Sequence, residues 1–341
     1  MIIEVLDLIH CPSCKSNLTI DGNFTNGEYI EKGECFCKSC SAIYPIVNDI
    51  IFFSKTPNSK ASEAQKKVYS YWWNESHSDV EYDDSSNITI FKQTIKLDEL
   101  DFKNGVTLDL GCGNGRFSSN LAQIHPKLLV LFDISDGIEK AYKDALKITK
   151  NVIAIQGDIM NIPFKPGVFD NVYSWGVLHH TGSTSEAFNQ ASILVKPNGK
   201  LGVYLYENHP VYSSDNIGLR FISIIRELIL IRPLRFLSQF FSPNILIKFF
   251  YPIFLFERFF NIGLIGCHGS GENKFEKNRY FRVVIDRFKS RYASEHSNEE
   301  VVRWFIDKGF NDIEIGEGVK VCITGRKEET KSSKVSVMIN L

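Results

Sequence analysis

The chain has 341 residues, enough for one full α/β domain and smaller parts. Its 39 Lys and Arg residues nearly balance 40 Asp and Glu residues, so no global basic field indicates a nucleic-acid-binding protein. The N-terminal sequence MIIEVLDLIH has no basic start and no long apolar core. We therefore expect no secretory signal and a cytoplasmic location.

Residues 1–53 contain two C-x-x-C pairs, one at Cys11 and Cys14 and one at Cys37 and Cys40. Two such pairs can place four thiolates around one ion, which predicts a structural Zn²⁺ site. Cys35 is a further thiol that could replace Cys37 as a ligand. The chain has eight cysteines, and without an export signal they favour metal thiolates over disulfides.

The run after the second pair, SAIYPIVNDII, resembles the small zinc-binding partner of tRNA and release-factor methyltransferases. A similar zinc module precedes some rRNA guanine methyltransferases, so the resemblance implies an RNA substrate as one hypothesis. However, residues 1–53 carry three Lys against seven Asp and Glu residues, and an acidic surface repels phosphates. We expect a zinc-ribbon module that acts as a structural or protein-contacting cap.

Residues 54–104 are expected to form a linker and lead-in helices. The polar stretch 54–62 includes a proline and indicates a linker, whereas residues 65–74 and 88–100 look helical. Tyr69, Trp72 and Trp73 either close over a cofactor or simply pack the first helix onto the domain.

The stretch from residue 105 to residue 117, GVTLDLGCGNGRF, organises the rest of the chain. It predicts a strand over residues 106–110, a glycine-rich turn and the start of a helix. The G-x-G-x-G spacing differs from the G-x-G-x-x-G of dinucleotide binders. Asp109 at the end of the strand suits a cofactor with a cationic end. The alternative is an ordinary turn between a strand and a helix.

Further buried strands are predicted over residues 128–133, 152–158, 168–176 and 200–206, separated by helical segments. This alternation predicts an α/β fold with a doubly wound, Rossmann-like parallel sheet. Asp133 ends the second strand, where ligands of such sheets bind, and we expect it to hold ribose hydroxyls. Asp136 is expected to cap the next helix.

The pattern of residues 105–207 resembles class I S-adenosylmethionine-dependent methyltransferases, and residues 296–327 resemble their closing segment. The resemblance implies a seven-stranded sheet whose last strand is antiparallel, and S-adenosyl-L-methionine as cofactor. In similar enzymes an Asp accepts from the adenine amino group and an apolar residue follows it against the ring. The residues that fit the cofactor site are Asp109, Gly111, Gly113, Gly115, Asp133, Ile134, Asp158, Ile159 and Ser174. A helix cap is the alternative role of Asp158.

The segment SWGVLHHT resembles small-molecule methyltransferases, including the ubiquinone and menaquinone group, and no Asn/Asp-Pro-Pro-Tyr/Phe motif is present there. Methyl transfer mainly requires alignment of the acceptor, and a base helps when the acceptor is a hydroxyl or an acidic carbon. His179 or His180 is the candidate base, because histidine titrates near neutral pH. The alternative is that these histidines pack or cap.

Residues 208–277 form an apolar insertion that we expect to contain two or three short helices. Between residues 220 and 262 six Lys and Arg residues outnumber two Glu residues. Charges and prolines interrupt the segment before any uncharged run reaches the roughly 18 residues of a spanning helix. The insertion could be a lid, a peripheral membrane contact, or a core or dimer contact.

Residues 278–327 are expected to complete the core, with a helix over residues 299–308, a hairpin of residues 312–317 and 319–326, and a loose tail at 328–341. Ser297 or Asn298 is expected to cap the helix. The run resembles the acceptor-side segment of related methyltransferases, which makes Asp286, Arg291, Tyr292 and His296 secondary candidates for the active site.

Taken together, the sequence predicts an S-adenosylmethionine-dependent methyltransferase with a structural zinc ribbon and a small-molecule acceptor, either lipid-linked or sugar-like. The first alternative is an rRNA or tRNA methyltransferase. The second is a scaffold or regulatory protein that binds the cofactor without turnover.

Overall fold

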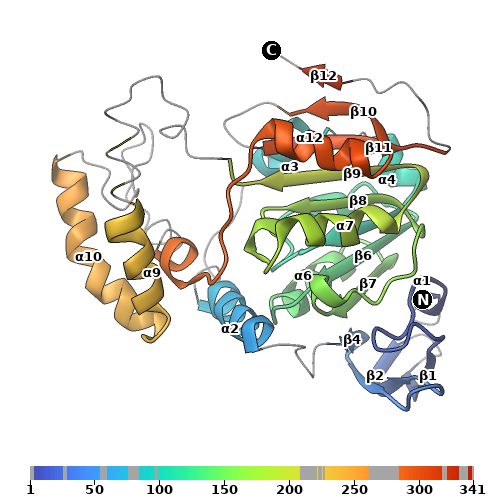
Figure 1. The fold of residues 1–341 in the computed structure, drawn as a ribbon. Coiled ribbons are helices and arrows are strands. Elements are labelled where there is room, and N and C mark those ends of the chain that lie inside the picture. Colours follow the sequence, from blue (N-terminus) through green and yellow to red (C-terminus); the bar gives the residue numbers. More distant parts are fainter. Residues whose placement is uncertain are drawn as a thin grey trace.

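The computed structural model describes residues 4–25, 29–53, 60–75, 84–96, 99–207, 221, 225, 227–260, 284–316, 321–329 and 337–339. Within these residues one twelve-stranded sheet has the order β1-β2-β3-β4-β7-β6-β5-β8-β9-β11-β10-β12. Figure 1 shows this sheet with helices on both of its faces and a pair of helices to one side.

The middle of the sheet is parallel except for β11, which runs antiparallel to both of its neighbours. Its strands are β5 (Val106–Leu110), β6 (Leu128–Asp133), β7 (Val152–Gln156), β8 (Phe169–Trp175), β9 (Val195–Leu205), β10 (Phe310–Ile315) and β11 (Val321–Lys327). Every residue of β5, β6 and β7 is buried, as expected for parallel strands that helices cover on both faces. The doubly wound α/β fold predicted from the sequence is therefore confirmed.

Two groups of helices cover the two faces of the sheet. The first group packs into one apolar core and consists of α7 (Thr184–Leu194) and α12 (Asn298–Asp307). The second group packs into a separate core and consists of α3 (Asp84–Ile95), α4 (Glu99–Asn104), α5 (Ser118–Ala122) and α6 (Ile138–Leu146). The Ser297 hydroxyl accepts a hydrogen bond from the Glu300 N–H, so Ser297 caps α12 as predicted.

The N-terminal module (residues 4–53) continues the same sheet. Its elements are α1 (Val5–Leu8), β1 (Thr19–Thr25), β2 (Tyr29–Phe36), β3 (Ile43–Val47) and β4 (Ile50–Phe52). β4 pairs in parallel with β7, with Ile51 opposite Ile155, and Ile9 forms a bridge with Phe164. Apolar residues of the module and of the parallel strands share one core, so the module is packed against the sheet.

The described sheet has twelve strands, so the predicted count of seven is not confirmed, although the seven strands β5 to β11 include the expected antiparallel last strand. β1 to β4 extend it beyond β7, and β12 (Val337–Ile339) extends it beyond β10 in a parallel pairing. The count failed because both extensions rest on pairing between segments far apart in the sequence. Residues 337–339 also depart from the predicted loose tail, since they pair with Ile313–Ile315 of β10.

The described part of the insertion is helical. It contains η4 (Glu227–Ile231), a π-helical turn, followed by α9 (Arg232–Ser238) and α10 (Pro243–Phe260), and it packs on the π-helical turn η5 (Ile285–Lys289). α10 continues through Pro252, although we expected prolines to interrupt this segment. Arg220 and Arg226 lie outside the described residues. No helix among those described is long and apolar enough to cross a membrane.

Candidate active site

The glycine-rich turn follows β5 directly and adopts a backbone that glycine favours. Gly111, Gly113 and Gly115 have φ values of +92°, +55° and +89°. A Cβ atom on Gly111 would lie 2.5 Å from Val177, and one on Gly113 would lie 2.4 Å from the ring of Trp73 in α2 (Lys60–Glu75). The backbone of this turn is therefore closely enclosed, which requires residues without side chains.

Asp133 ties the end of β6 to the glycine-rich turn. Its Oδ2 accepts from the Gly113 N–H at 2.8 Å, and its Oδ1 accepts from the Ser135 N–H at 2.7 Å and from the Ser135 hydroxyl at 2.6 Å. Burial raises the pKa of Asp133, and these hydrogen bonds act in the opposite direction. Its predicted bond to ribose stays a prediction.

Asp109 is a second buried carboxyl group at the same edge of the sheet. Burial raises its pKa to about 7, although a hydrogen bond from the Ser118 hydroxyl opposes the rise. A nearby positive charge would favour the ionised forms of Asp109 and Asp133. These two carboxyl groups and the enclosed glycine-rich turn fit a cofactor with a cationic end, such as S-adenosylmethionine.

The other predicted cofactor residues have structural partners. The Ser174 hydroxyl donates to the carbonyl of Leu110 at 2.7 Å, and Asp158 caps a short 3₁₀ turn, η2 (Ile159–Asn161), by accepting from the Met160 N–H at 2.9 Å. Ile159 is buried in the core. Ile134 is half-buried directly after Asp133. The cap on η2 is the alternative that we gave for Asp158, and the adenine contact stays a prediction.

Gly115 faces a helix. A Cβ atom at this position would lie 2.8 Å from the Ala141 Cα in α6. The glycine therefore allows α6 to pack closely on the turn, and its predicted contact with the cofactor is not tested by this geometry.

Lead-in helix α2 lies against the carboxyl edge through polar contacts that we did not predict. The Lys66 ammonium donates to Gln156 Oε1 at 3.0 Å and lies 3.3 Å from Asp136 Oδ1, and the Gln156 amide donates to the same carboxylate at 2.9 Å. The predicted helix cap at Asp136 is wrong, because Lys66 and Gln156 hold its side chain and α6 begins without a side-chain cap. A polar residue at the end of a buried strand, Gln156, was the available signal.

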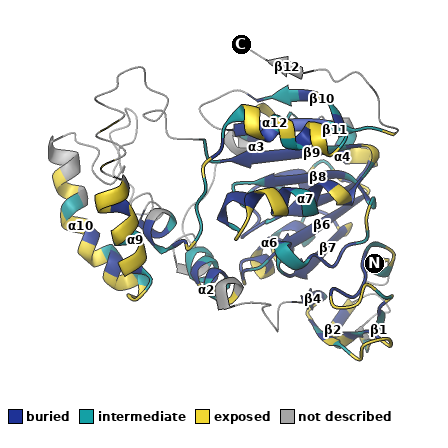
Figure 2. Ribbon diagram, in the orientation of Figure 1, coloured by how far each residue is buried: buried dark blue, intermediate teal, exposed yellow. Residues whose placement is uncertain are grey.

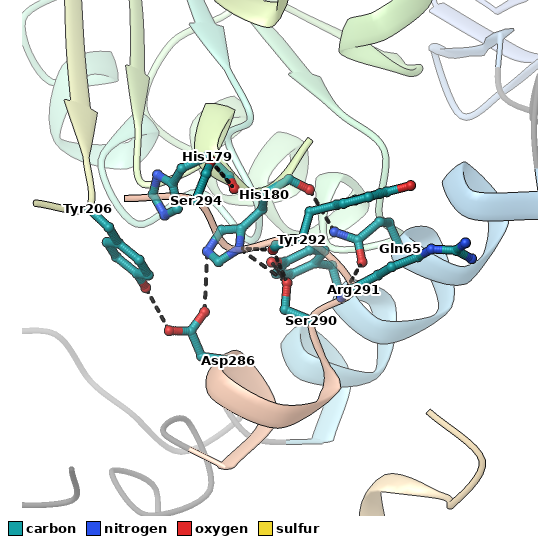
Figure 3. Close-up of polar contacts among 10 residues, drawn as sticks. Gln65, His179, His180, Tyr206, Asp286, Ser290, Arg291, Tyr292 and Ser294 are labelled. Carbon is teal, nitrogen blue, oxygen red and sulfur yellow. Dashed lines mark hydrogen bonds and ion pairs between the residues drawn. The ribbon is translucent and has the colours of Figure 1, made fainter. Parts of the chain in front are cut away.

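A second polar cluster joins four distant segments, as Figure 3 shows. His180, in the 3₁₀ turn η3 (Leu178–His180), places Nε2 3.2 Å from Asp286 Oδ1. The Tyr206 hydroxyl donates to Asp286 Oδ2 at 2.7 Å. The Gln65 amide donates to the carbonyl of His180 at 2.7 Å. Asp286 was a secondary candidate in the sequence, whereas Gln65 and Tyr206 were missed.

The surroundings of His180 constrain its protons. Its Nδ1 lies 2.9 Å from the carbonyl oxygen of Tyr292, and because a carbonyl oxygen only accepts, Nδ1 carries a proton. Its Nε2 faces Oδ1 of Asp286 at 3.2 Å. His180 is almost fully buried, whereas the Asp286 side chain is 24% exposed. Asp286 is therefore the accessible member of the pair.

The other predicted acceptor-side residues lie nearby but have different partners. The His179 ring is buried and stands 3.9 Å from the ring of Tyr206. The Arg291 N–H donates to Gln65 Oε1 at 3.2 Å. His296 pairs with Glu300 of α12 at 3.0 Å, and its backbone N–H donates to the carbonyl of Tyr206. The cluster thus gathers His179, Arg291 and Tyr292, whereas the His296 side chain turns toward α12.

Four thiols of the N-terminal module lie close together. The Sγ atoms of Cys11, Cys14, Cys37 and Cys40 are all within 4.8 Å of one another. A tetrahedral zinc site with Zn–S bonds of about 2.3 Å would hold its sulfurs roughly 3.8 Å apart, so the arrangement fits. Cys35 is fully buried and its Sγ atom lies outside this group.

Comparison with known proteins shows that part of the chain is similar to methyltransferases. Residues 108–203 match the family described as "Methyltransferase domain". The chain is similar to the sterol 24-C-methyltransferase of Gibberella zeae, with 27% identity over 124 residues that cover 36% of this chain and 33% of the relative. It is also similar to the 27-O-demethylrifamycin SV methyltransferase of Amycolatopsis mediterranei, with 28% identity over 159 residues, 43% of this chain and 58% of the relative.

One similar solved structure is the magnesium protoporphyrin IX methyltransferase of Synechocystis, with a TM-score of 0.42, 13% identity, and coverage of 80% of this chain and 96% of that one. The segments matched in the two curated relatives amount to less than two thirds of their length. Residues 108–203 are a methyltransferase domain of the S-adenosylmethionine-dependent class.

Proposed function

We propose that the protein transfers a methyl group from S-adenosylmethionine to a small-molecule acceptor that loses a proton in the reaction. This proposal rests on two features that lie at one edge of the sheet. The first is the glycine-rich turn with two buried carboxyl groups, and the second is the pair of His180 and Asp286. The two similar methyltransferases are named for a sterol and for a rifamycin, which supports a small-molecule acceptor.

Asp109 and Asp133 would hold the cofactor beside the glycine-rich turn. Bound S-adenosylmethionine supplies a methyl group on a sulfonium leaving group, so the protein mainly has to align the acceptor. Asp109 would favour the cationic end of the cofactor and Asp133 would accept from its ribose hydroxyls, and the glycines of the turn would add no side chains of their own.

Asp286 would take the proton of the acceptor, while His180 holds the carboxylate in place and stabilises its ionised form. The Tyr206 hydroxyl donates to the other carboxylate oxygen and fixes its orientation. Gln65 supports the arrangement by bonding the carbonyl of His180 and the N–H of Arg291. In this assignment His179 packs against Tyr206, and His180 acts through Asp286.

The decisive experiment uses methyl-labelled S-adenosylmethionine with the full chain and a cell extract separated into RNA, protein, lipid and small polar fractions. We expect label in the lipid or small-molecule fraction. Label in RNA would replace the proposal with the RNA alternative. Cofactor binding without label in any fraction would favour the scaffold alternative.

The base is tested once the labelled acceptor is known. Asp286→Asn should lower turnover roughly 10²- to 10⁴-fold, the usual contribution of a general base, while cofactor binding is retained. Asp307→Asn changes an exposed carboxylate at the end of α12 and serves as the matched control. Equal turnover in the two variants would remove Asp286 from the mechanism.

We also propose that Cys11, Cys14, Cys37 and Cys40 hold one structural Zn²⁺. The support is the approach of the four Sγ atoms and the exclusion of Cys35 from the group. The ion would fix the module that pairs with β7, and no step of methyl transfer is assigned to it.

A further inference from the structure

We propose that the helical hairpin formed by α9 and α10 docks on the surface of an anionic phospholipid bilayer. This inference goes beyond the proposed function, because docking can occur and be measured without methyl transfer. It rests on three observations. The outer face of the hairpin is apolar, the net charge of the hairpin is positive, and the hairpin is attached to η5, which carries the proposed base Asp286.

The outer face of the hairpin is unusually apolar. Among the described residues nineteen large hydrophobic side chains are exposed, and nine of them lie in the hairpin, between residues 232 and 260. In the hairpin, Phe240 is 73% exposed, Phe236 66% and Phe249 59%. Figure 2 shows exposed residues along both helices, which stand apart from the sheet. Contiguous apolar surfaces of this kind mark interaction sites.

The inner face of the hairpin is already occupied. Leu246 and Phe250 of α10 pack with Ile231, Val284 and Phe288 in a small core, and the rings of Phe250 and Phe288 stack at 4.3 Å. The exposed side chains therefore do not form the core of this hairpin, and in the described part of the chain nothing covers its outer face.

The charges of the hairpin select an anionic partner. Residues 232–260 contain four basic residues, Arg232, Arg235, Lys248 and Arg258, and one acidic residue, Glu257. Aromatic and aliphatic side chains interspersed with basic residues are typical of helices that lie in the membrane interface. A second copy of the hairpin would bring basic residues against basic residues, so self-association is disfavoured. No described helix qualifies as a membrane span, so the hairpin would lie along the surface.

The hairpin is attached to η5, the element that carries Asp286. The Lys289 ammonium donates to the carbonyls of Ser238, Gln239 and Phe241 at 3.2, 3.1 and 2.7 Å. The Ser238 hydroxyl donates to the carbonyl of Phe288. Docking would therefore hold η5, the element that carries Asp286, in a fixed position relative to the bilayer, which would favour a lipid-anchored acceptor; this last step rests on the proposed function.

The test is sedimentation of the full chain with vesicles of phosphatidylcholine alone and of phosphatidylcholine mixed with phosphatidylglycerol. We expect binding to the mixed vesicles that weakens as salt is added. Removing two basic residues in Arg232→Gln/Lys248→Gln should weaken binding by more than about tenfold, since each is worth about 1 kcal/mol near an anionic surface.

Phe236→Ser/Phe240→Ser should abolish the remaining attachment, and Ile43→Ser, at an exposed apolar residue of the N-terminal module, is the matched control. Failure of the wild-type chain to bind mixed vesicles would overturn the proposal. So would a dimer in sedimentation velocity that dissociates in the phenylalanine variant. Cofactor binding, measured on the same samples, separates these outcomes from a failure of the proposed function.

Discussion

Substitution of Gly115 by Ala tests whether this glycine serves helix packing or the cofactor. The new Cβ would lie 2.8 Å from the Ala141 Cα, and φ at this position is +89°. The left-handed backbone costs about 1–2 kcal/mol for a residue with a side chain, and overpacking adds about 1–3 kcal/mol. We therefore expect the free energy of unfolding to fall by about 2–5 kcal/mol in urea titrations.

Gly309→Ala is the matched control, because Gly309 has φ of +74° and a Cβ atom there would meet nothing within 4 Å. It should lose only the backbone part, about 1–2 kcal/mol. The smaller freedom of Ala in the unfolded chain is common to both variants and cancels in the comparison. If Gly115→Ala is as stable as the control but binds S-adenosylmethionine more weakly, the packing argument is refuted and the cofactor contact takes its place.

Three other predictions concern the buried carboxyl group and the N-terminal module. The pKa of Asp109 rises on folding from 3.8 to about 7, so the folded chain binds a proton more tightly than the unfolded chain does. This protonation stabilises the fold fully below pH 3.8, and the stabilisation is lost as the pH rises to about 7. The free energy of unfolding, measured as a function of pH, should decline over this range, and the decline should be smaller in Asp109→Asn. If the pH dependence is the same in the variant, the decline is due to other groups. Cys14→Ser should lose one zinc ion per chain by elemental analysis while Cys35→Ser retains it, and equal zinc in both would contradict the proposed site. A chain that begins at residue 60 should be insoluble or expanded in size-exclusion chromatography, because it exposes apolar residues of the shared core such as Ile155; a compact monomer would show that the module is dispensable.

Local features of the sequence were enough to predict the centre of the fold. β5 and β6 have the predicted bounds, because fully buried apolar runs are followed directly by a glycine-rich turn or an Asp. The carboxyl ends of neighbouring parallel strands meet at one edge, so the strand bounds alone predict that Asp109 and Asp133 lie at the same edge of the sheet.

Contacts between distant segments could not be predicted in this way. His180 and Asp286 are separated by 105 intervening residues, and the pattern around either one does not specify the other. The pairing of Ile51 with Ile155 was missed because a three-residue strand carries too little periodicity. Asp136 was misjudged as a cap because Lys66, on a helix far earlier in the chain, draws its carboxylate away.

The pairing of β4 with β7 also has a consequence for the behaviour of the protein in concentrated solution. Without β4, the outer side of β7 would present unpaired N–H and C=O groups, a template onto which strands of other molecules can add. The outermost strand of the complete sheet at that end is β1, which is shifted in register between Gly22 and Phe24 and is therefore a poorer template. Since we propose that zinc holds the module together, the supply of zinc would decide whether this template is covered and hence whether the protein stays dispersed or forms aggregates.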